Sequence, residues 1–332
     1  MIDPIINIKN LRTSFQSDGV EIPIVNSINF SINPGEVLGV VGESGCGKSV
    51  TSLSIMGLVE GKVEGEILFK GENLAKTSEK RMRMIRGNEI AMIFQEPMTS
   101  LNPLFTIGEQ LTEALLIHRK WNKKQAKARA IEMLKMVGLG RAEELMDEYP
   151  HQLSGGMRQR VMIAMAMICE PELLIADEPT TALDVTIQAQ ILELMKLLNQ
   201  NFNTAIMMIT HDLGVVAEMC QRMIVMYAGN IVEEGDVKDI FQHPKHPYTV
   251  GLIKSVPDMR GKKERLFSIP GNVPKPGALK SGCPFAPRCP HHMDICLTET
   301  PALHTFENGQ SARCLLYEHG KGADFLDNTA AN

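Results

Sequence analysis

The chain has 332 residues, of which 44% are hydrophobic, and this predicts one large or two medium globular domains rather than a disordered chain. The formal net charge of -5, without a long basic run interleaved with aromatic residues, argues against a nucleic-acid partner. The apolar runs are shorter than the roughly 18 to 20 residues of a membrane-spanning helix, and the N-terminus lacks a signal-peptide pattern. We therefore expect a cytosolic protein that does not cross a membrane. The cytosol is reducing and the number of cysteines, seven, is odd, so structural disulfides are disfavoured.

The N-terminal part of the chain predicts a β layer, followed by a strand, a glycine-rich loop and a helix. Hydrophobic and polar residues alternate in "SINFSIN" from Ser27, which is typical of a strand with one buried face in an antiparallel layer. The apolar stretch "GEVLGVV" from Gly35 predicts a buried strand, and "VTSLSIMGLV" from Val50 predicts a helix. The loop between them therefore leads from a strand directly into a helix.

The middle of the chain predicts a helical insert within an α/β core. Apolar residues recur at helical spacing from Glu109 to Val137, so residues 97–170 are expected to be mainly helical. The segments "PELLIADEP" and "NTAIMMITHD" predict two apolar strands, and "MIVMYAGNIVEEG" predicts a hairpin that turns at Gly229 and Asn230. After Phe241 the chain becomes rich in Pro, Gly and His, which indicates a boundary between a domain of residues 1–242 and one of residues 243–332.

The loop at residues 42–49 has the pattern G-x-x-x-x-G-K-[ST] of a phosphate-binding loop, in the strand and helix context that this motif requires. Its residues are Gly42, Glu43, Ser44, Gly45, Cys46, Gly47, Lys48 and Ser49. Glycines allow backbone N–H groups to face phosphate oxygens, Lys48 would reach the β- and γ-phosphates, and the Ser49 hydroxyl would hold Mg²⁺. Cys46 is interpreted as a small loop-filling residue, because no base is evident beside it to activate a nucleophile.

Two further segments predict groups that act on a bound nucleotide. In "LLIADE" a hydrophobic strand ends in Asp177, which suits Mg²⁺ ligation through Ser49 and water, and Glu178, which suits a general base for the attacking water. In "LSGGMRQR" a serine and two glycines at a helix start would present a hydroxyl and free N–H groups to an anion. The alternative for Ser154 is an ordinary helix N-cap.

The order of these motifs resembles that of the ATP-binding subunit of an ABC transporter, over residues 5–240. The order is "GESGCGKS", Gln95 in "AMIFQEP", then "LSGGMRQR", "LLIADE", "TALD" and "ITHD". The resemblance implies an α/β ABC ATPase fold with a RecA-like core, an antiparallel β subdomain and a helical subdomain at residues 97–170. It also implies that two such subunits, copies or paralogues, pair head to tail, so that Ser154, Gly155 and Gly156 grip the γ-phosphate of the partner's ATP.

The same resemblance implies further roles. Gln95 would contact Mg²⁺ and the attacking water, and His211 would hydrogen-bond the γ-phosphate and orient Glu178. Asp184 in "TALD" would lie at the subunit junction, and Phe15 would stack on adenine, with a place in the strand core as its alternative. Many relatives carry a second hydroxyl residue after the loop serine, whereas this chain has Val50, so an α-phosphate contact there would come from the backbone.

The segments "HPKHPYTVGLI" and "IPGNVPKPGALKSGCPFAPRCP" resemble the C-terminal domain of ATPase subunits that serve dipeptide and oligopeptide importers, a group that includes nickel importers. This resemblance implies two transmembrane permease subunits and an extracytoplasmic peptide-binding protein as partners. It also implies a peripheral position on the cytoplasmic face of the plasma membrane. The insert around "EPMTSLNPLFTIGEQ" would receive short cytoplasmic helices of the permease.

Four cysteines of the tail, Cys283, Cys289, Cys296 and Cys314, have the spacing C-x5-C-x6-C-x17-C. These gaps are wider than the paired ligand spacing of structural zinc, so spacing alone leaves an iron–sulfur cluster, zinc and unliganded thiols open. The resemblance implies a [4Fe-4S] cluster, which would staple a small, irregular, metal-dependent C-terminal domain with little core of its own.

Two other classes of protein share some of these features. A soluble ABC-type ATPase acting on ribosomes or DNA should show a second cassette, a long coiled coil or a basic surface, none of which the sequence shows. A redox-sensing protein with a vestigial ATPase is disfavoured by intact Lys48, Asp177, Glu178 and His211. The sequence therefore predicts an ATP-hydrolysing subunit that powers import of di- or oligopeptides, with nickel or another small solute as the alternative cargo.

Overall fold

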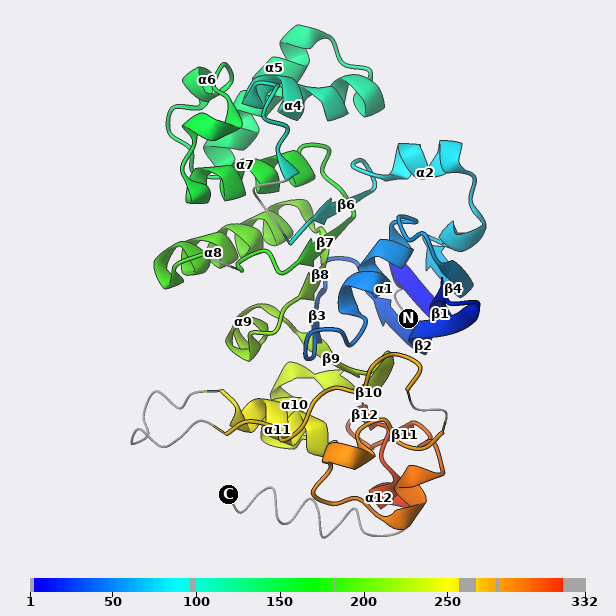
Figure 1. Ribbon diagram of the computed structural model, residues 1–332. Coiled ribbons are helices and arrows are strands. Elements are labelled where there is room, and N and C mark those ends of the chain that lie inside the picture. Colours follow the sequence, from blue (N-terminus) through cyan, green and yellow to red (C-terminus); the bar gives the residue numbers. More distant parts are fainter. Residues whose placement is uncertain (1–2, 96–99, 182, 257–266, 279–280, 319–332) are drawn as a thin grey trace. The chain divides into compact units, whose positions relative to one another are not determined.

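The computed structural model describes residues 3–95, 100–181, 183–256, 267–278 and 281–318 (Figure 1). The chain divides into two compact units. The first unit comprises Met1–Ile6, Ile32–Glu36 and Phe69–Ile209. The second unit comprises Asn7–Ser31, Val37–Leu68 and Thr210–Asn332. Each unit therefore joins segments that are far apart in the sequence.

In the second unit, the N-terminal strands form a sheet in the order β2-β1-β4. Their bounds are β1 Ile6–Ser17, β2 Val20–Ile32 and β4 Lys62–Phe69. Along β2 the side chains of Ile28, Phe30 and Ile32 are buried, whereas that of Asn29 is exposed. This confirms the predicted alternation, because successive side chains of a strand point to opposite faces and only one face of β2 is covered.

A second sheet of the same unit carries the strand that precedes the phosphate-binding loop. Its order is β3-β9-β10-β12-β11, with β3 parallel to β9 and the other pairs antiparallel. The bounds are β3 Val37–Val41, β9 Arg222–Tyr227, β10 Asn230–Asp236, β11 His304–Thr305 and β12 Ser311–Ala312. All five residues of β3 are buried, as the apolar run predicted, and helix α1 (Lys48–Ile55) follows the loop.

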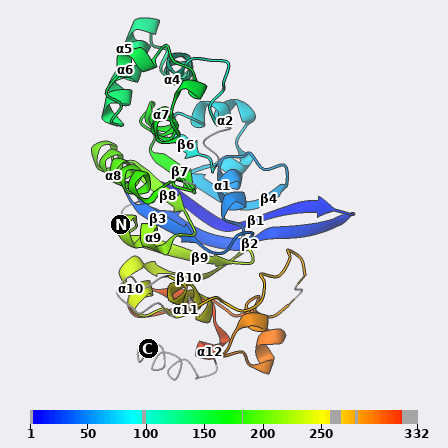
Figure 2. The same cartoon turned by 60° about the vertical axis from the view of Figure 1, so that its left-hand side comes forward.

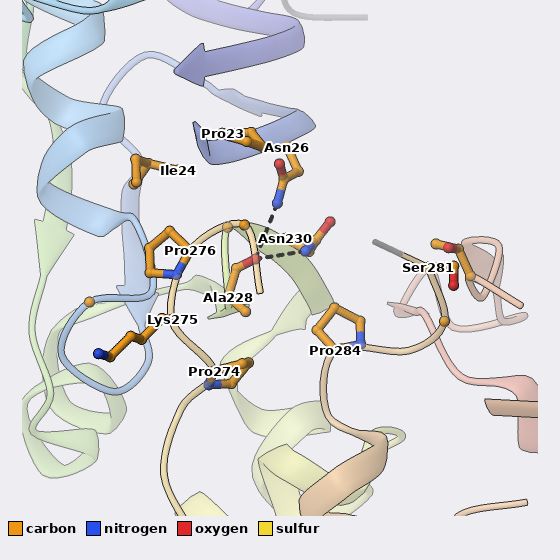
Figure 3. A pocket seen from close by; sticks show the side chains of 15 residues that line it. Pro23, Ile24, Asn26, Ala228, Asn230, Pro274, Lys275, Pro276, Ser281 and Pro284 are labelled. Atoms are coloured by element: carbon orange, nitrogen blue, oxygen red, sulfur yellow. Dashed lines mark hydrogen bonds between the residues drawn. The ribbon is translucent and has the colours of Figure 1, made fainter. Parts of the chain in front are cut away.

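The β9–β10 hairpin turns one residue earlier than predicted. Asn230 pairs with Tyr227, so the two turn residues are Ala228 (φ 44°) and Gly229 (φ 79°), both left-handed as in a type I′ turn. Asn26 and Asn230 donate to the carbonyl of Ala228 at 3.2 and 2.8 Å (Figure 3). These bonds hold the turn in this register, because they engage Asn230 as the first strand residue rather than as part of the turn.

The helices of the second unit are short. Besides α1, they are α9 Leu213–Met219, α10 Val237–Gln242, α11 Pro247–Lys254, η4 Ala286–Arg288, η5 Asp294–Leu297 and α12 Leu315–Glu318. Helix α10 packs against β10, which directly precedes it (Figures 1 and 2). From residue 267 onward the described chain has only 3₁₀ turns, two-residue strands and one four-residue helix, which agrees with the expected irregular tail.

The first unit contains three parallel strands in the order β8-β7-β6 and most of the helices. These three strands are β6 Ile90–Ile93, β7 Leu173–Asp177 and β8 Ala205–Ile209, and the unit also contains the two-residue strand β5 Glu72–Asn73. The helices are η1 Leu74–Lys76, α2 Glu79–Ile85, α4 Ile107–Ala114, η2 Leu115–Arg119, α5 Lys123–Met136, α6 Ala142–Leu145, η3 Pro150–Gln152, α7 Gly155–Met167 and α8 Val185–Phe202.

The predicted helical insert is confirmed from α4 to α7, and residues 97–99 of the prediction lie outside the described residues. The helical pattern of residues 109–137 is interrupted by the π-helical turn η2 and by Lys120, whose left-handed φ of 54° ends that turn. Asn122 then caps α5 by accepting from the N–H of Gln125 at 2.9 Å. Among the described residues, no helix has the length and apolar composition of a membrane span.

Candidate nucleotide site

The phosphate-binding loop closes tightly around the side chain of Lys48. The lysine is buried, and its Nζ donates to the carbonyls of Gly42 at 2.6 Å and Glu43 at 3.1 Å. Gly42 lies so close to the β9 backbone that a Cβ atom there would be 2.2 Å from the carbonyl oxygen of Met226. The glycine is therefore required by space as well as by its backbone angle, and the ammonium group is directed along the inside of the loop.

The other residues of the loop divide into exposed and buried positions. Ser44 and Gly45 are exposed, Ser49 is half-buried in the first turn of α1, and Cys46 is buried. Burial raises the pKa of the Cys46 thiol, so it remains protonated at neutral pH, in agreement with a loop-filling role. Beyond Val50, the hydroxyl of Thr51 donates to the carbonyl of Gly47 at 3.0 Å and is thereby committed to the helix.

The outer side of the loop is held by residues that sequence reasoning missed. The backbone N–H of Glu43 donates to the hydroxyl of Tyr248 at 2.8 Å, and the Glu43 carboxylate forms two bonds with the Arg288 guanidinium at 2.6 and 3.0 Å. The N–H of Gly229 donates to the carbonyl of Cys46 at 3.0 Å. These partners are 183 to 245 residues away along the chain, and no local pattern could have identified them.

The structure places His211 beside the phosphate-binding loop. A pocket of about 610 Å³ is lined by His211 and Asp212 together with Gly42 and Glu43 of the loop. The backbone at His211 is fixed on both sides, because Asp212 N–H donates to Thr210 Oγ1 at 3.0 Å and Asp212 Oδ1 accepts from Gly214 N–H at 2.8 Å. The second hydrogen bond caps α9, so the histidine lies directly before a capped helix.

Phe15 lies half-buried on β1, next to the segment that precedes β4. A Cβ atom at Gly61 would be 3.3 Å from Cδ1 of the Phe15 ring. Two residues earlier, and so on the same face of the strand, the Thr13 hydroxyl lies 2.9 Å from that of Ser54 in α1. Phe15 is thus on the face of β1 that contacts the helix of the phosphate-binding loop.

In the first unit, the end of β7 brings a carboxylate together with Gln95. Asp177 is buried, and Glu178, in a left-handed conformation with φ 50°, accepts at Oε2 from Gln95 Nε2 at 3.1 Å and from Thr181 Oγ1 at 2.9 Å. The N–H of Glu178 donates to the carbonyl of Ile209 at 2.9 Å. Strained residues of this kind persist where several interactions hold them, and here the constraint fixes the direction of the carboxylate.

Two helix starts of the first unit lie side by side. Ser154 caps α7 by accepting from Met157 N–H at 3.3 Å, which confirms the N-cap interpretation. Asp184 caps α8 by accepting from Ile187 N–H at 2.9 Å. A Cβ atom at Gly156 would be 3.5 Å from Ile187, whereas one at Gly155 would meet nothing within 4 Å. Ser154 and Gly155 are exposed, so the positive end of α7 is open to an anion.

The four tail cysteines are free thiols that pack against three apolar clusters. Cys283 and Cys289 lie against the cluster around Phe285, Cys296 packs with Ala286 and Leu315 and is also contacted by Cys283, and Cys314 packs with Leu316. Burial, and secondarily the neighbouring cysteines, raises the pKa of Cys289 to about 11 and that of Cys314 to about 12. Cys289 and Cys314 are therefore protonated at neutral pH, and both lie within electrostatic range of Cys283 and Cys296.

The metal-stapled domain expected from the sequence is not shown by the structure. Within the described part of the chain, which includes all four tail cysteines, no group of three or more His, Cys, Asp or Glu side chains is placed to hold a metal ion. Instead the thiols pack among apolar side chains, and Cys283 contacts both the cluster around Phe285 and the cluster of Cys296.

Comparisons with known proteins agree with this geometry. The family model described as "ABC transporter" matches residues 25–181, and "Oligopeptide/dipeptide transporter, C-terminal region" matches residues 232–296. A dimeric structure of the ATP-binding cassette MJ0796, in a post-hydrolysis state bound to ADP and Pi, has a TM-score of 0.64 and 29% identity, and covers 70% of this chain and 98% of its own. The fold is therefore that of an ABC ATPase cassette, and the chain is an ATP-hydrolysing transporter subunit.

The curated relatives identify the family. The oligopeptide transport ATP-binding protein AppD of Bacillus subtilis is 56% identical over 96% of this chain and 98% of its own length. The oligopeptide transport ATP-binding protein OppD of Escherichia coli is 49% identical over 94% of this chain and 93% of its own length. The chain belongs to this family, the ATP-binding proteins of oligopeptide ABC transporters.

Proposed function

We propose that this chain is the ATP-hydrolysing motor that powers import of di- or oligopeptides through a membrane ABC transporter. The observation that carries the proposal is the hydrogen bond between Gln95 and Glu178, together with a buried Lys48 in an intact phosphate-binding loop. Relatives that match nearly the whole chain are named for oligopeptide transport, which supports peptides as the cargo.

In the proposed reaction the loop residues bind ATP, with Gly42 to Gly47 facing the phosphates through backbone N–H groups and Lys48 contacting the β- and γ-phosphates. Ser49 and Gln95 would hold Mg²⁺, since hydroxyl and amide oxygens are ligands that this ion accepts, and Asp177 would act on it through Ser49 and water. Glu178 would accept a proton from the attacking water while His211 hydrogen-bonds the γ-phosphate. Phe15 would stack on adenine.

The second half of the site would come from another ATPase subunit, a copy or a paralogue. Ser154, Gly155 and Gly156 would bind the γ-phosphate held by that subunit, which the exposure of Ser154 and Gly155 at the start of α7 supports. Asp184 would lie at the junction, and the next residue, Val185, has 83% of its surface exposed, which fits a contact made only in the pair. ATP binding would close the pair and product release would open it.

The motor would act with two transmembrane permease subunits and an extracytoplasmic peptide-binding protein, from a peripheral position on the cytoplasmic face of the plasma membrane. A pocket of about 920 Å³ between α4 and α5 supports this arrangement. Its lining includes Phe105, Leu116, Ile117, Met146 and Met165, adaptable apolar side chains that suit a short permease helix. We also propose that residues 1–242 form the ATPase domain and residues 243–332 an accessory domain.

The test is peptide-stimulated ATP hydrolysis by the complex reconstituted in lipid vesicles with its permease subunits and binding protein. We expect di- or oligopeptides to stimulate hydrolysis, and Lys48→Ala to abolish it while leaving assembly intact. Stimulation by nickel alone, or equal hydrolysis with and without peptide, would reject the peptide cargo.

The four tail cysteines remain our proposal for a [4Fe-4S] site, supported by their free thiols and mutual proximity, although it would require the sulfur atoms to move together. Iron and sulfide analysis after anaerobic purification tests it. Stoichiometric zinc without iron, or no metal at all, would reject the iron–sulfur cluster.

A further inference from the structure

Arg288 has every hydrogen-bond donor of its guanidinium engaged. Nε donates to the carbonyl of Pro270 at 2.8 Å, Nη1 donates to Glu43 and to the Tyr227 hydroxyl at 2.6 and 3.3 Å, and Nη2 donates to Glu43 and the carbonyl of Ile269 at 3.0 and 3.3 Å. The side chain is only 4% exposed. A guanidinium has five N–H donors in a fixed planar fork, so full engagement at a buried position holds it in one orientation.

Aromatic rings form the walls around this guanidinium. It lies 5.8 Å from the ring centre of Tyr227 and 6.0 Å from that of Phe285. Tyr227 and Phe285 meet edge to face with their centres 5.2 Å apart, and Tyr248 packs against both. Because Tyr248 also accepts from the N–H of Glu43, one rigid cluster holds both the backbone and the carboxylate of that loop residue.

Two segments of different character meet at this pair. Glu43 is the second residue of the phosphate-binding loop, whereas Arg288 ends the 3₁₀ turn η4 and directly precedes Cys289. Both residues belong to the second unit. A bidentate, charge-assisted pair shielded from solvent on the arginine side is stronger than the exposed ion pairs found elsewhere on the chain.

We propose that Arg288 is a positioning residue through which the cysteine-bearing tail holds the phosphate-binding loop in its ATP-binding conformation. The inference rests on the proposed nucleotide role of the loop and adds a determinant of ATP affinity outside it. Without Arg288, the Glu43 carboxylate loses its only two-bond partner among the described contacts. The loop then becomes ordered only when ATP binds, and the conformational entropy lost in that step weakens ATP affinity.

The test measures the Kd of the purified full-length chain for a fluorescent ATP analogue, and KM and kcat for ATP in the assembled complex. For Arg288→Gln we expect Kd and KM to rise about tenfold with kcat nearly unchanged, the size expected for loss of a charge-assisted hydrogen bond. Arg288→Lys should recover part of this loss, because lysine keeps the charge without the fork. Glu43→Gln should resemble Arg288→Gln, and the double variant should be no worse than either single variant.

Arg81→Gln is the matched control, since Arg81 on α2 forms a comparable two-bond pair with Glu89, and its loss should leave Kd unchanged. The thermal midpoint of every variant is measured as well. A variant whose fold is weakened is then recognised by a lower midpoint without a matching change in Kd. A Kd within twofold of the unsubstituted chain for folded Arg288→Gln, or multiplied effects in the double variant, would overturn the inference. Lys48→Ala distinguishes failure of this inference from failure of the proposed function. If the loop does not bind ATP at all, Lys48→Ala should leave ATP binding intact. If only the role of Arg288 is wrong, Lys48→Ala should still lose ATP binding.

Discussion

Gln95 Nε2 donates to Glu178 Oε2 at 3.1 Å, joining the end of β6 to the residue that follows β7. Thr181 donates to the same oxygen at 2.9 Å, and the backbone of Glu178 is held left-handed at φ 50°. The carboxylate thus has a fixed orientation that depends on two side chains and a strained backbone. A general base needs such an orientation more than it needs an unusual pKa.

The first prediction concerns Glu178→Gln. The amide keeps the size of the side chain but cannot accept a proton from water, so we expect ATP to bind with similar affinity and hydrolysis to fall at least about 100-fold. The ATP-bound pair of subunits should persist longer, which size-exclusion chromatography with ATP would detect. Glu172→Gln is the control, because this exposed residue of the same segment pairs with Lys70 on the surface and should retain full turnover. Full turnover by Glu178→Gln would remove Glu178 as the base.

The second prediction separates the two roles of Ser154. Ser154→Ala removes the cap of α7 and should lower the stability of the fold by about 1 kcal/mol. It should also reduce ATP hydrolysis by the complex. Ser154→Asp should restore the cap and the stability but not hydrolysis, because its carboxylate repels a phosphate. Ser78→Ala removes the equivalent cap of α2 and should lose only stability. Normal hydrolysis by Ser154→Asp would leave Ser154 with a capping role alone.

The third prediction concerns the hairpin turn behind the phosphate-binding loop. Gly229 and Gly309 have similar left-handed φ angles of 79° and 83°, but a Cβ atom at Gly229 would lie 2.4 Å from the carbonyl oxygen of Ile24, whereas one at Gly309 meets nothing within 4 Å. Gly309→Ala should cost only the backbone strain of about 1 kcal/mol. Gly229→Ala should cost clearly more, measured by denaturant unfolding, and should weaken ATP binding through the bond to Cys46. Equal costs would show that the hairpin adapts.

The fourth prediction concerns pH. His246 is buried and caps α11 by accepting from Tyr248 N–H at 3.1 Å, and burial lowers its pKa from 6.5 to about 3. The unfolded chain therefore binds a proton below pH 6.5 that the folded chain refuses, so stability present above pH 6.5 is lost as the pH falls toward 3. His246→Asn keeps a capping oxygen but does not titrate, and should lack this loss of up to about 1.4 kcal/mol per pH unit.

Denaturant unfolding of both chains between pH 7.5 and 5 checks this difference. The neighbouring Glu233 accepts from His246 N–H at 2.9 Å, and burial raises its pKa to about 7, so its contribution runs the other way, falling as the pH rises from 4.5 through 7. Both chains contain Glu233, and its effect cancels in the comparison. Parallel pH profiles would contradict the buried, neutral state of His246.

The local elements could be predicted from the sequence because each rests on short-range physics. The strand at Val37–Val41 is a continuous apolar run, β2 alternates with period two, and the glycines and Lys48 of the phosphate-binding loop stand in consecutive positions. The order of such motifs along the chain indicated its family. The turn residues of the hairpin were misplaced by one, because hydrogen bonds from Asn26, outside the hairpin, help set its register.

Contacts between distant segments were decided only by the tertiary structure. Nothing near Glu43 in the chain predicts that Arg288 and Tyr248 hold it, and nothing near Gln95 predicts its bond to Glu178, because these pairs form when separate strands and turns pack together. The four tail cysteines also show that spacing in the sequence does not determine where side chains lie in the fold. Their spacing suggested one metal site, whereas the described residues show no such site and pack the thiols among apolar side chains, because burial of each segment determines where its side chains lie.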